Sequence, residues 1–199
     1  GDAWGAVVRY EDIGHVADDR VAAADYDALL EKMRTMEDKL NRSRAGQGYP
    51  TITVSGWAER PHYEPANHSL VWARDLAFSD SVKHTLNYEV RLLGRDGVLS
   101  LNFLAAIDRL PQIREAAATI AARTRFDPGA SYADFDPDRD RRAAYGLAGL
   151  VAQGSGLDPA SAPDTGRSLA MIAALAIALV ALTLLTTFYR RRMGASSAP

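Results

Sequence analysis

The spacing of apolar residues changes from a strand period to a helix period within the first fifty positions. Residues 6–10 form a short β-branched and aromatic run, which predicts a strand. Asp25 then stands where an N-cap would begin a helix that runs to about Asn41, and the Gly- and Pro-containing stretch 46–50 ends it. One buried helical stripe is expected from the apolar residues of this segment: Tyr26, Leu29, Leu30, Met33 and Leu40.

Alternation with a period of two predicts four more strands. The first two are residues 51–58 and 69–73, with a turn at residues 60–65 between them. The clearest hairpin joins residues 86–93 to residues 98–105 through a Gly-Arg-Asp-Gly turn. Even positions oppose odd positions across this turn, so the large apolar side chains of both strands share one face: Tyr88, Val90 and Leu92 with Leu99, Leu101 and Phe103.

Two helices are expected to complete the domain. Pro111 suits a first helical position, and Asp136 followed by Pro137 suits a cap and a helix start. Their inward stripes are Ile113, Ala116, Ala117 and Ile120 in the first helix, and Ala144, Leu147, Ala148 and Val151 in the second. The sequence therefore predicts an α+β domain, an antiparallel sheet of about five strands with packed helices.

Residues 169–189 form an apolar run of 21 residues without charge, Pro or Gly. At ~1.5 Å rise per residue such a helix is about 32 Å long, which is enough to cross a hydrocarbon core of ~30 Å. We therefore predict one C-terminal transmembrane helix. The expected organisation is an α+β domain, a flexible linker, the membrane helix with its basic flank, and a short tail: residues 1–152, 153–166, 167–192 and 193–199.

The charges that flank this run predict its orientation. Three arginines, 190–192, follow the run, whereas only Arg167 precedes it, close to Asp164. The positive-inside rule then places the tail in the cytoplasm and the folded domain outside it. Such a domain needs an export signal, and the sequence opens at Gly1 without an initiator Met, so further upstream residues are expected.

Composition narrows the function classes. A hydrophobic content of 47% with 24% charged residues is ordinary for a folded domain. When the four arginines around the apolar run are set aside, 25 acidic residues face 19 basic ones, so the domain is a poor nucleic-acid binder. The absence of Cys excludes disulfides, thiolate catalysis and Cys-ligated zinc. No motif indicates a cofactor, and the oligomeric state stays open.

Residues 134–140 have Asp at every second position, which is a feature of calcium-binding loops. A calcium loop that started at Asp134 would need Gly at its sixth position and Glu at its twelfth, where this chain has Arg139 and Tyr145. A helix cap with acids in the first turn explains the pattern better.

The predicted hairpin from Trp57 to Trp72 carries the candidate binding residues. Trp57, Tyr63 and Trp72 either pack in the core or form an exposed aromatic patch beside His62 and His68. The two histidines, with a glutamate between them, could also ligate a metal, although solvated surface histidines explain them more simply. No G-x-S-x-G elbow and no phosphate-binding loop is present.

Many short motifs follow one another along the chain: WGAVVRY at residues 4–10, GYP at 48–50, GWAE at 56–59, PHY at 61–63, LVWA at 70–73, TLNY at 85–88, LGR at 93–95, GVL at 97–99, LNF at 101–103, FDPG at 126–129, YADF at 132–135 and AAYGL at 143–147. In this order they resemble the bacterial membrane-anchored proteins grouped as domain of unknown function 2167. The resemblance implies a single-pass protein of the bacterial inner membrane and supplies no catalytic residue. His15 departs from it, since the family tends to have Tyr there.

Two functions follow from these observations. The first is a non-catalytic module outside the cytoplasm that binds a partner protein or an envelope component near the membrane. The second is a membrane-tethered hydrolase or ligand sensor with its site near residues 57–72, where a hydrolase would use His62, Glu64 and His68.

Overall fold

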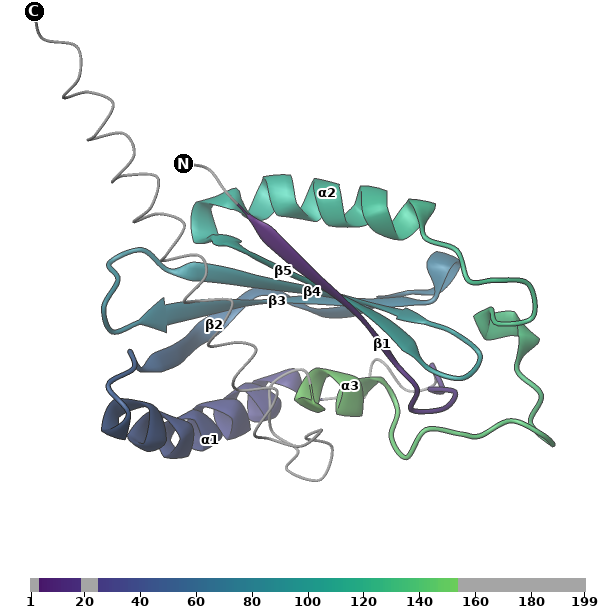
Figure 1. The fold of residues 1–199 in the computed structure, drawn as a ribbon, viewed down its shortest axis with the longest axis horizontal. Coiled ribbons are helices and arrows are strands. Elements are labelled where there is room, and N and C mark those ends of the chain that lie inside the picture. The colour runs from purple at the N-terminus through teal and green to yellow at the C-terminus, as the bar shows by residue number, and fades with distance from the viewer. Residues whose placement is uncertain (1–3, 19–24, 154–199) are drawn as a thin grey trace, which may run out of the picture. The chain divides into compact units, whose positions relative to one another are not determined.

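The fold is built on one antiparallel sheet of five strands. In chain order the strands are β1 (Gly5–Glu11), β2 (Ile52–Glu64), β3 (Ser69–Phe78), β4 (Thr85–Leu93) and β5 (Val98–Ala106). They lie side by side in the order β1-β5-β4-β3-β2 (Figure 1). The structure is a computed structural model that describes residues 4–18 and 25–153. The predicted α+β class and the five-stranded antiparallel sheet are confirmed.

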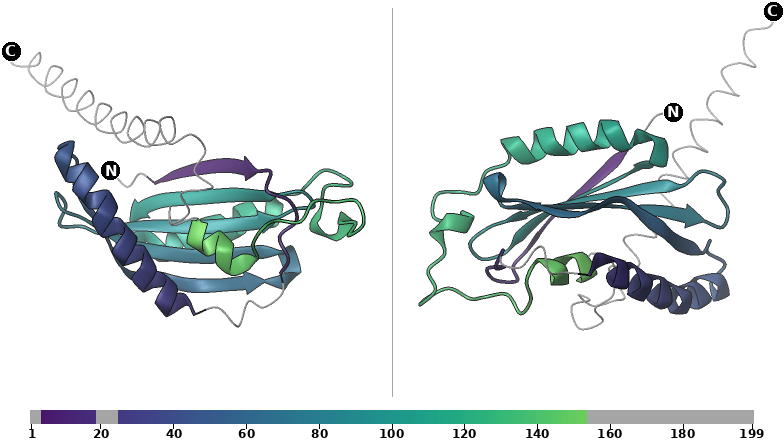
Figure 2. Two further views of the ribbon diagram at one scale, coloured as in Figure 1. Left: turned by 90° about the horizontal axis from the view of Figure 1, so that it is seen from below. Right: turned by 180° about the vertical axis from the view of Figure 1, so that it is seen from behind.

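Helix α2 (Leu110–Arg123) covers one face of the sheet (Figures 1 and 2). The β4–β5 hairpin has the predicted register, with Tyr88 opposite Phe103 on this face. The helix buries a row of side chains spaced four residues apart: Ile113, Ala117 and Ala121. Ile120, which was expected inside, is exposed because this narrow row takes the inward positions.

Helices α1 (Tyr26–Gly46) and α3 (Leu147–Gln153) lie on the opposite face (Figure 2). Asp25 caps α1 as predicted, since its Oδ1 accepts a hydrogen bond of 2.9 Å from the N–H of Ala28. The core on this face joins both helices to the strands: Tyr26, Leu30 and Met33 from α1, Leu147, Leu150 and Val151 from α3, and Val54, Leu70, Trp72, Leu93 and Val98 from the sheet.

The C-terminal half of α1 covers the edge of β2 with polar side chains. The Asn41 side chain bonds both the C=O and the N–H of Ile52, at 2.6 Å and 2.9 Å, and Glu37 accepts a bond of 2.8 Å from the Val54 N–H. Leu40 is therefore 48% exposed, contrary to the apolar stripe predicted for this helix. Side-chain capping of an edge strand replaces apolar packing at this end of α1.

Strand β2 is longer than predicted because the expected turn at residues 60–65 is largely strand. Pro61 lies where the pairing with β3 shifts register between Glu59 and His62, and such a bulge accommodates a proline that has no N–H to donate. The turn itself shrinks to a single 3-10 turn, η2 (Pro65–Asn67).

The last helix is shorter than predicted. It begins at Leu147, and the residues after Asp136 form turns instead of its first half. The Asp140 carboxylate accepts a bond of 2.7 Å from the Asp136 N–H, so the acidic side chain closes a turn. The predicted inward residues Leu147 and Val151 are buried, whereas Ala144 and Ala148 are exposed.

Beside the α1–α3 core, strands β4 and β5 carry buried polar side chains. Arg91 donates a hydrogen bond of 2.5 Å to Glu11 of β1, and its Nε lies 3.3 Å from a carboxylate oxygen of Glu89. Asn102 also donates to Glu89. Burial opposes ionisation of Glu11, but Arg91 and Arg9 outweigh it and hold the pKa of this carboxyl below its usual range.

The predicted linker, transmembrane helix and tail lie outside the described residues. Within residues 4–18 and 25–153, no helix has both the length and the apolar character that crossing a bilayer requires. The membrane helix at residues 169–189 therefore stays a prediction.

Candidate functional site

Aromatic and imidazole rings form a continuous stack beside the turn between β2 and β3. The ring centroids are 4.2 Å apart for His68 and Tyr132, 4.4 Å for Tyr132 and His15, and 3.8 Å for His15 and Phe135. The guanidinium carbon of Arg142 lies 4.9 Å from the centroid of the Phe135 ring and extends the stack. These side chains come from segments that are far apart in the sequence, so the fold itself builds the stack.

The segment after β1 places His15 in the stack. The His15 N–H donates to the C=O of Arg141 and the Ala143 N–H donates to the C=O of His15, both at 2.8 Å. Gly14 allows this approach, because its φ is +88° and a Cβ there would come within 2.8 Å of the Arg141 carbonyl oxygen. The backbone therefore fixes the position of the His15 ring.

The turn between β4 and β5 anchors the segment that carries Tyr132 and Phe135. Arg95 from this turn holds the Asp140 carboxylate through two bonds of 2.7 Å and 2.9 Å and also donates to the C=O of Gly129. The hydrogen bond from Arg95 holds the pKa of Asp140 below its usual range. Both ends of the segment are thus tied to the sheet.

A hydrogen-bonded cluster lies at the His68 end of the stack. The Tyr63 hydroxyl donates a bond of 2.7 Å to Asp18, and its oxygen lies 2.9 Å from Nδ1 of His68. Because a phenol has one proton, this network assigns Nδ1 of His68 as the donor to Tyr63. Burial, followed by the bond to Asp18, raises the pKa of Tyr63 well above its usual range, so the phenol keeps its proton.

His68 has an unusual backbone conformation. Its φ is +48°. Among the described residues, every other residue with a positive φ is a glycine. This left-handed geometry costs a residue with a Cβ about 1–2 kcal/mol. The His68 C=O meanwhile accepts a bond of 2.9 Å from the Leu93 N–H, so the strained residue is held between the sheet and the stack.

His15 and Arg142 differ from the rest of the site in having side-chain nitrogens without a partner among the described residues. His15 is buried, and its Nδ1 has no hydrogen-bond partner among the described residues. Burial, with a smaller effect of the nearby Arg142 charge, lowers the pKa of His15, so the imidazole is neutral at pH 7. Arg142 is exposed and forms no ion pair with the described part of the chain.

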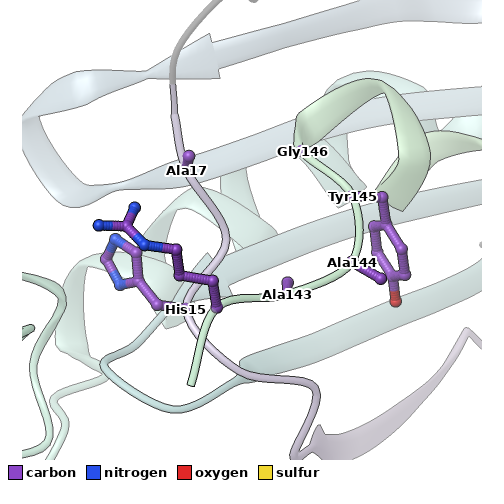
Figure 3. A pocket seen from close by; sticks show the side chains of 7 residues that line it. His15, Ala17, Ala143, Ala144, Tyr145 and Gly146 are labelled. Carbon is purple, nitrogen blue, oxygen red and sulfur yellow. The ribbon is translucent and has the colours of Figure 1, made fainter. Parts of the chain in front are cut away.

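A cavity of about 230 Å³ adjoins the stack at His15. Figure 3 shows the residues that line it, which come from the segment of His15 and Ala17 and from the segment that runs from Ala143 to Gly146. Arg142 also lines it. The site therefore combines a half-exposed hydrogen-bonded cluster with a small concave pocket.

The structure brings together two of the five candidate residues from the sequence, Tyr63 and His68. His62 faces the α2 side of the sheet, because it pairs with Val71, and its Nε2 lies 3.7 Å from both Glu59 and Glu64. The register therefore puts the two histidines on opposite faces.

The two tryptophans pack in or against the core and do not form an exposed aromatic patch. Trp72 is fully buried, with the Arg91 guanidinium 5.8 Å from its ring centroid. Trp57 is partly buried, and its Nε1 donates a bond of 3.2 Å to the C=O of Tyr26. Neither belongs to the stack.

Sequence reasoning missed most of the site. Its remaining members are Asp18, His15, Tyr132, Phe135 and Arg142. The one available signal was the position of His15 and of the YADF motif within the family-like motifs. No spacing rule relates residues more than one hundred positions apart.

Metal ligation has no geometric basis in the described part of the chain. No group of three or more His, Cys, Asp or Glu side chains there could hold a metal ion.

Comparison with protein families gives a match over most of the chain. A family model described as "Protein of unknown function (DUF2167)" matches residues 1–187. No curated protein matches the sequence, and no solved structure matches the fold.

Proposed function

The chain belongs to the DUF2167 family, and from this premise we propose that it is a non-catalytic binding module. Its contact surface is the cluster of Asp18, Tyr63 and His68 with the adjoining ring stack, and its partner is a protein or an envelope component. The predicted helix at residues 169–189 tethers the module to the bacterial inner membrane, with the domain outside the cytoplasm.

The observation that carries this proposal is the partly exposed cluster of Asp18, Tyr63 and His68, which hydrogen bonds and the ring stack hold in place. His68 and Asp18 each leave 38% of their side chains exposed, although their partners are fixed in the fold. A surface that is already ordered loses little conformational entropy on association. Aromatic rings with polar tips also suit contacts that exclude water at their centre.

A hydrolase is the weaker candidate for two reasons. His62 and His68, which such a site would use together, lie on opposite faces of the sheet. The raised pKa of Tyr63 keeps its hydroxyl protonated and bonded to Asp18, so the phenol is a poor nucleophile or base.

Site-directed photocrosslinking in native membranes tests the proposal. A photoreactive residue replaces Asn67, which is exposed in η2 next to His68, in the full chain. A matched control carries the same residue at Ala118, which is exposed on α2 at the other face of the sheet. We expect a discrete crosslinked adduct from position 67 and none from position 118.

A second substitution links the adduct to the cluster. Tyr63→Phe removes the hydroxyl and keeps the ring, so it should weaken the adduct at position 67 without unfolding the domain. An adduct of equal yield from both positions, or one that Tyr63→Phe leaves unchanged, would place the contact surface elsewhere.

A further inference from the structure

The arginines beside the stack differ in one respect, which is the presence of a carboxylate partner. Arg95 pairs with Asp140 at 2.7 Å, and Arg141 donates to Asp12. Arg142 forms no ion pair with a carboxylate of the described part of the chain. Among the described residues, Arg142 therefore lacks the anionic partner that Arg95 and Arg141 have.

The position of Arg142 prepares it for such an anion. Its guanidinium carbon lies 4.9 Å from the Phe135 centroid, on a ring whose other neighbour is His15 at 3.8 Å. Contact with the face of a ring limits the positions of a guanidinium group, and its N–H groups can still donate hydrogen bonds away from the ring. A planar edge with parallel donors matches the two oxygens of a carboxylate.

The adjacent cavity can receive the group that carries the carboxylate. Arg142 and His15 line it together with small side chains, Ala17 and Ala143 among them. Its volume of about 230 Å³ is below the range of ~300–1,000 Å³ for pockets that hold a whole small molecule. It therefore suits one side chain or a chain end rather than a free cofactor.

We propose that this cavity binds a single carboxylate of the partner, an acidic side chain or a C-terminus, with Arg142 as the paired cation. The inference rests on the proposed binding function and assigns the chemistry of the partner. A carboxylate fits better than a phosphate, because among the described residues that line the cavity Arg142 is the one cation, and His15 beside it is neutral at pH 7. Phosphate sites usually need several cationic or backbone donors.

Acetate is the simplest probe of this site. The full chain, held in detergent micelles and labelled with carbon-13 at histidine Cε1, has four histidines and so gives four resolvable signals. His15→Phe, which keeps a stacked ring, identifies the His15 signal by its loss. We expect acetate to shift the His15 signal in a saturable way and to leave the His62 and His84 signals in place.

Variants at position 142 test the geometry. Arg142→Gln should weaken acetate binding at least about tenfold, as expected for the loss of a charge-assisted pair. Arg142→Lys should weaken it nearly as much, because an ammonium has no planar edge. Arg139→Gln is the matched control, since Arg139 is 81% exposed three positions away, and it should bind acetate as the parent chain does.

Several outcomes would overturn the assignment. A His15 signal that acetate does not move in the folded parent chain removes the carboxylate site. Equal shifts with acetamide would indicate binding without charge recognition, and equal or tighter binding of inorganic phosphate would indicate a general anion site. Full affinity in Arg142→Lys would reduce the interaction to simple attraction between charges.

The result is separable from the proposed function. If the adduct at position 67 forms while acetate does not bind, the result supports the proposed binding module and contradicts the proposed carboxylate site. If acetate binds and no adduct forms at position 67, the result supports the carboxylate pocket and contradicts the proposed partner surface at the β2–β3 turn.

Discussion

At the residue scale, the two histidines of the stack have opposite relations to solvent. His68 is half-exposed, has a positive φ and donates to Tyr63. His15 is buried, is held by backbone bonds and has a neutral ring. One is suited to contact a partner, and the other supports the stack from inside.

The backbone strain at His68 can be measured apart from its side-chain contacts. His68→Ala and His68→Asn both remove the imidazole stacked on Tyr132 and bonded to Tyr63. Asn tolerates the left-handed region better than Ala, so we expect His68→Asn to be more stable by about 1 kcal/mol. Urea unfolding of the two full-length variants gives the difference. Equal stabilities would mean that the turn relaxes when the imidazole is removed.

His15 should make stability depend on pH. Its pKa is lower in the folded protein than the value of about 6.5 in an unfolded chain, so the unfolded state binds its proton first. Stability from this residue is complete above about pH 6.5 and falls as the pH drops from there to the lowered folded pKa. We expect the urea midpoint of the parent chain to fall more between pH 7.5 and 5.5 than that of His15→Phe. Parallel midpoints would show that His15 accepts a proton in the folded state at no cost.

At the element scale, sequence patterns predicted the parts of the fold that local periodicity controls. The β4–β5 hairpin, the Asp25 cap and the rows through Leu30 and Ile113 follow from spacing within single elements. The failures share another cause. Pro61 enters a strand through a bulge set by β3, and α3 starts late because Asp140 is bound by Arg95 from a distant turn.

The candidate site also divides into a part that local sequence spacing predicts and a part that only tertiary contacts create. Tyr63 and His68 were found because one short turn joins them, five positions apart. Tyr132, His15 and Phe135 were missed because only tertiary contacts bring them together. Local sequence therefore predicted only the part of the site that the β2–β3 turn builds, which is Tyr63 and His68.

The Arg95–Asp140 pair is expected to control the order of the whole site segment. Asp140→Ala removes both bonds to Arg95 and the turn bond from the Asp136 N–H. We expect faster amide exchange in residues 129–146 and unchanged protection in β4 and β5, since opening is local. Asp138→Ala is the control, because Asp138 is exposed and its carboxylate has no hydrogen-bond or ion-pair partner among the described residues. Unchanged exchange in Asp140→Ala would mean that the ring stack alone orders the segment.

At the scale of the whole molecule, the function depends on where the folded unit is held. A binding surface near a membrane gains effective concentration for partners confined to the same membrane. The predicted helix at residues 169–189 would supply that confinement, and the linker at residues 153–166 would set its reach. The site at the β2–β3 turn could then meet a neighbouring envelope protein without high intrinsic affinity.

The orientation of the chain in the membrane is the last prediction. In bacterial cells that express the chain behind an export signal, the three arginines at 190–192 should keep the C-terminus in the cytoplasm. Protease added outside spheroplasts should then digest the domain and leave a C-terminal tag protected. Replacing the three arginines by Gln should expose part of the tag, because no basic residue then follows the apolar run while Arg167 still precedes it, whereas Arg167→Gln should strengthen the bias. A chain that washes off the membrane at alkaline pH would contradict the spanning helix itself, and a protected domain would reverse its orientation.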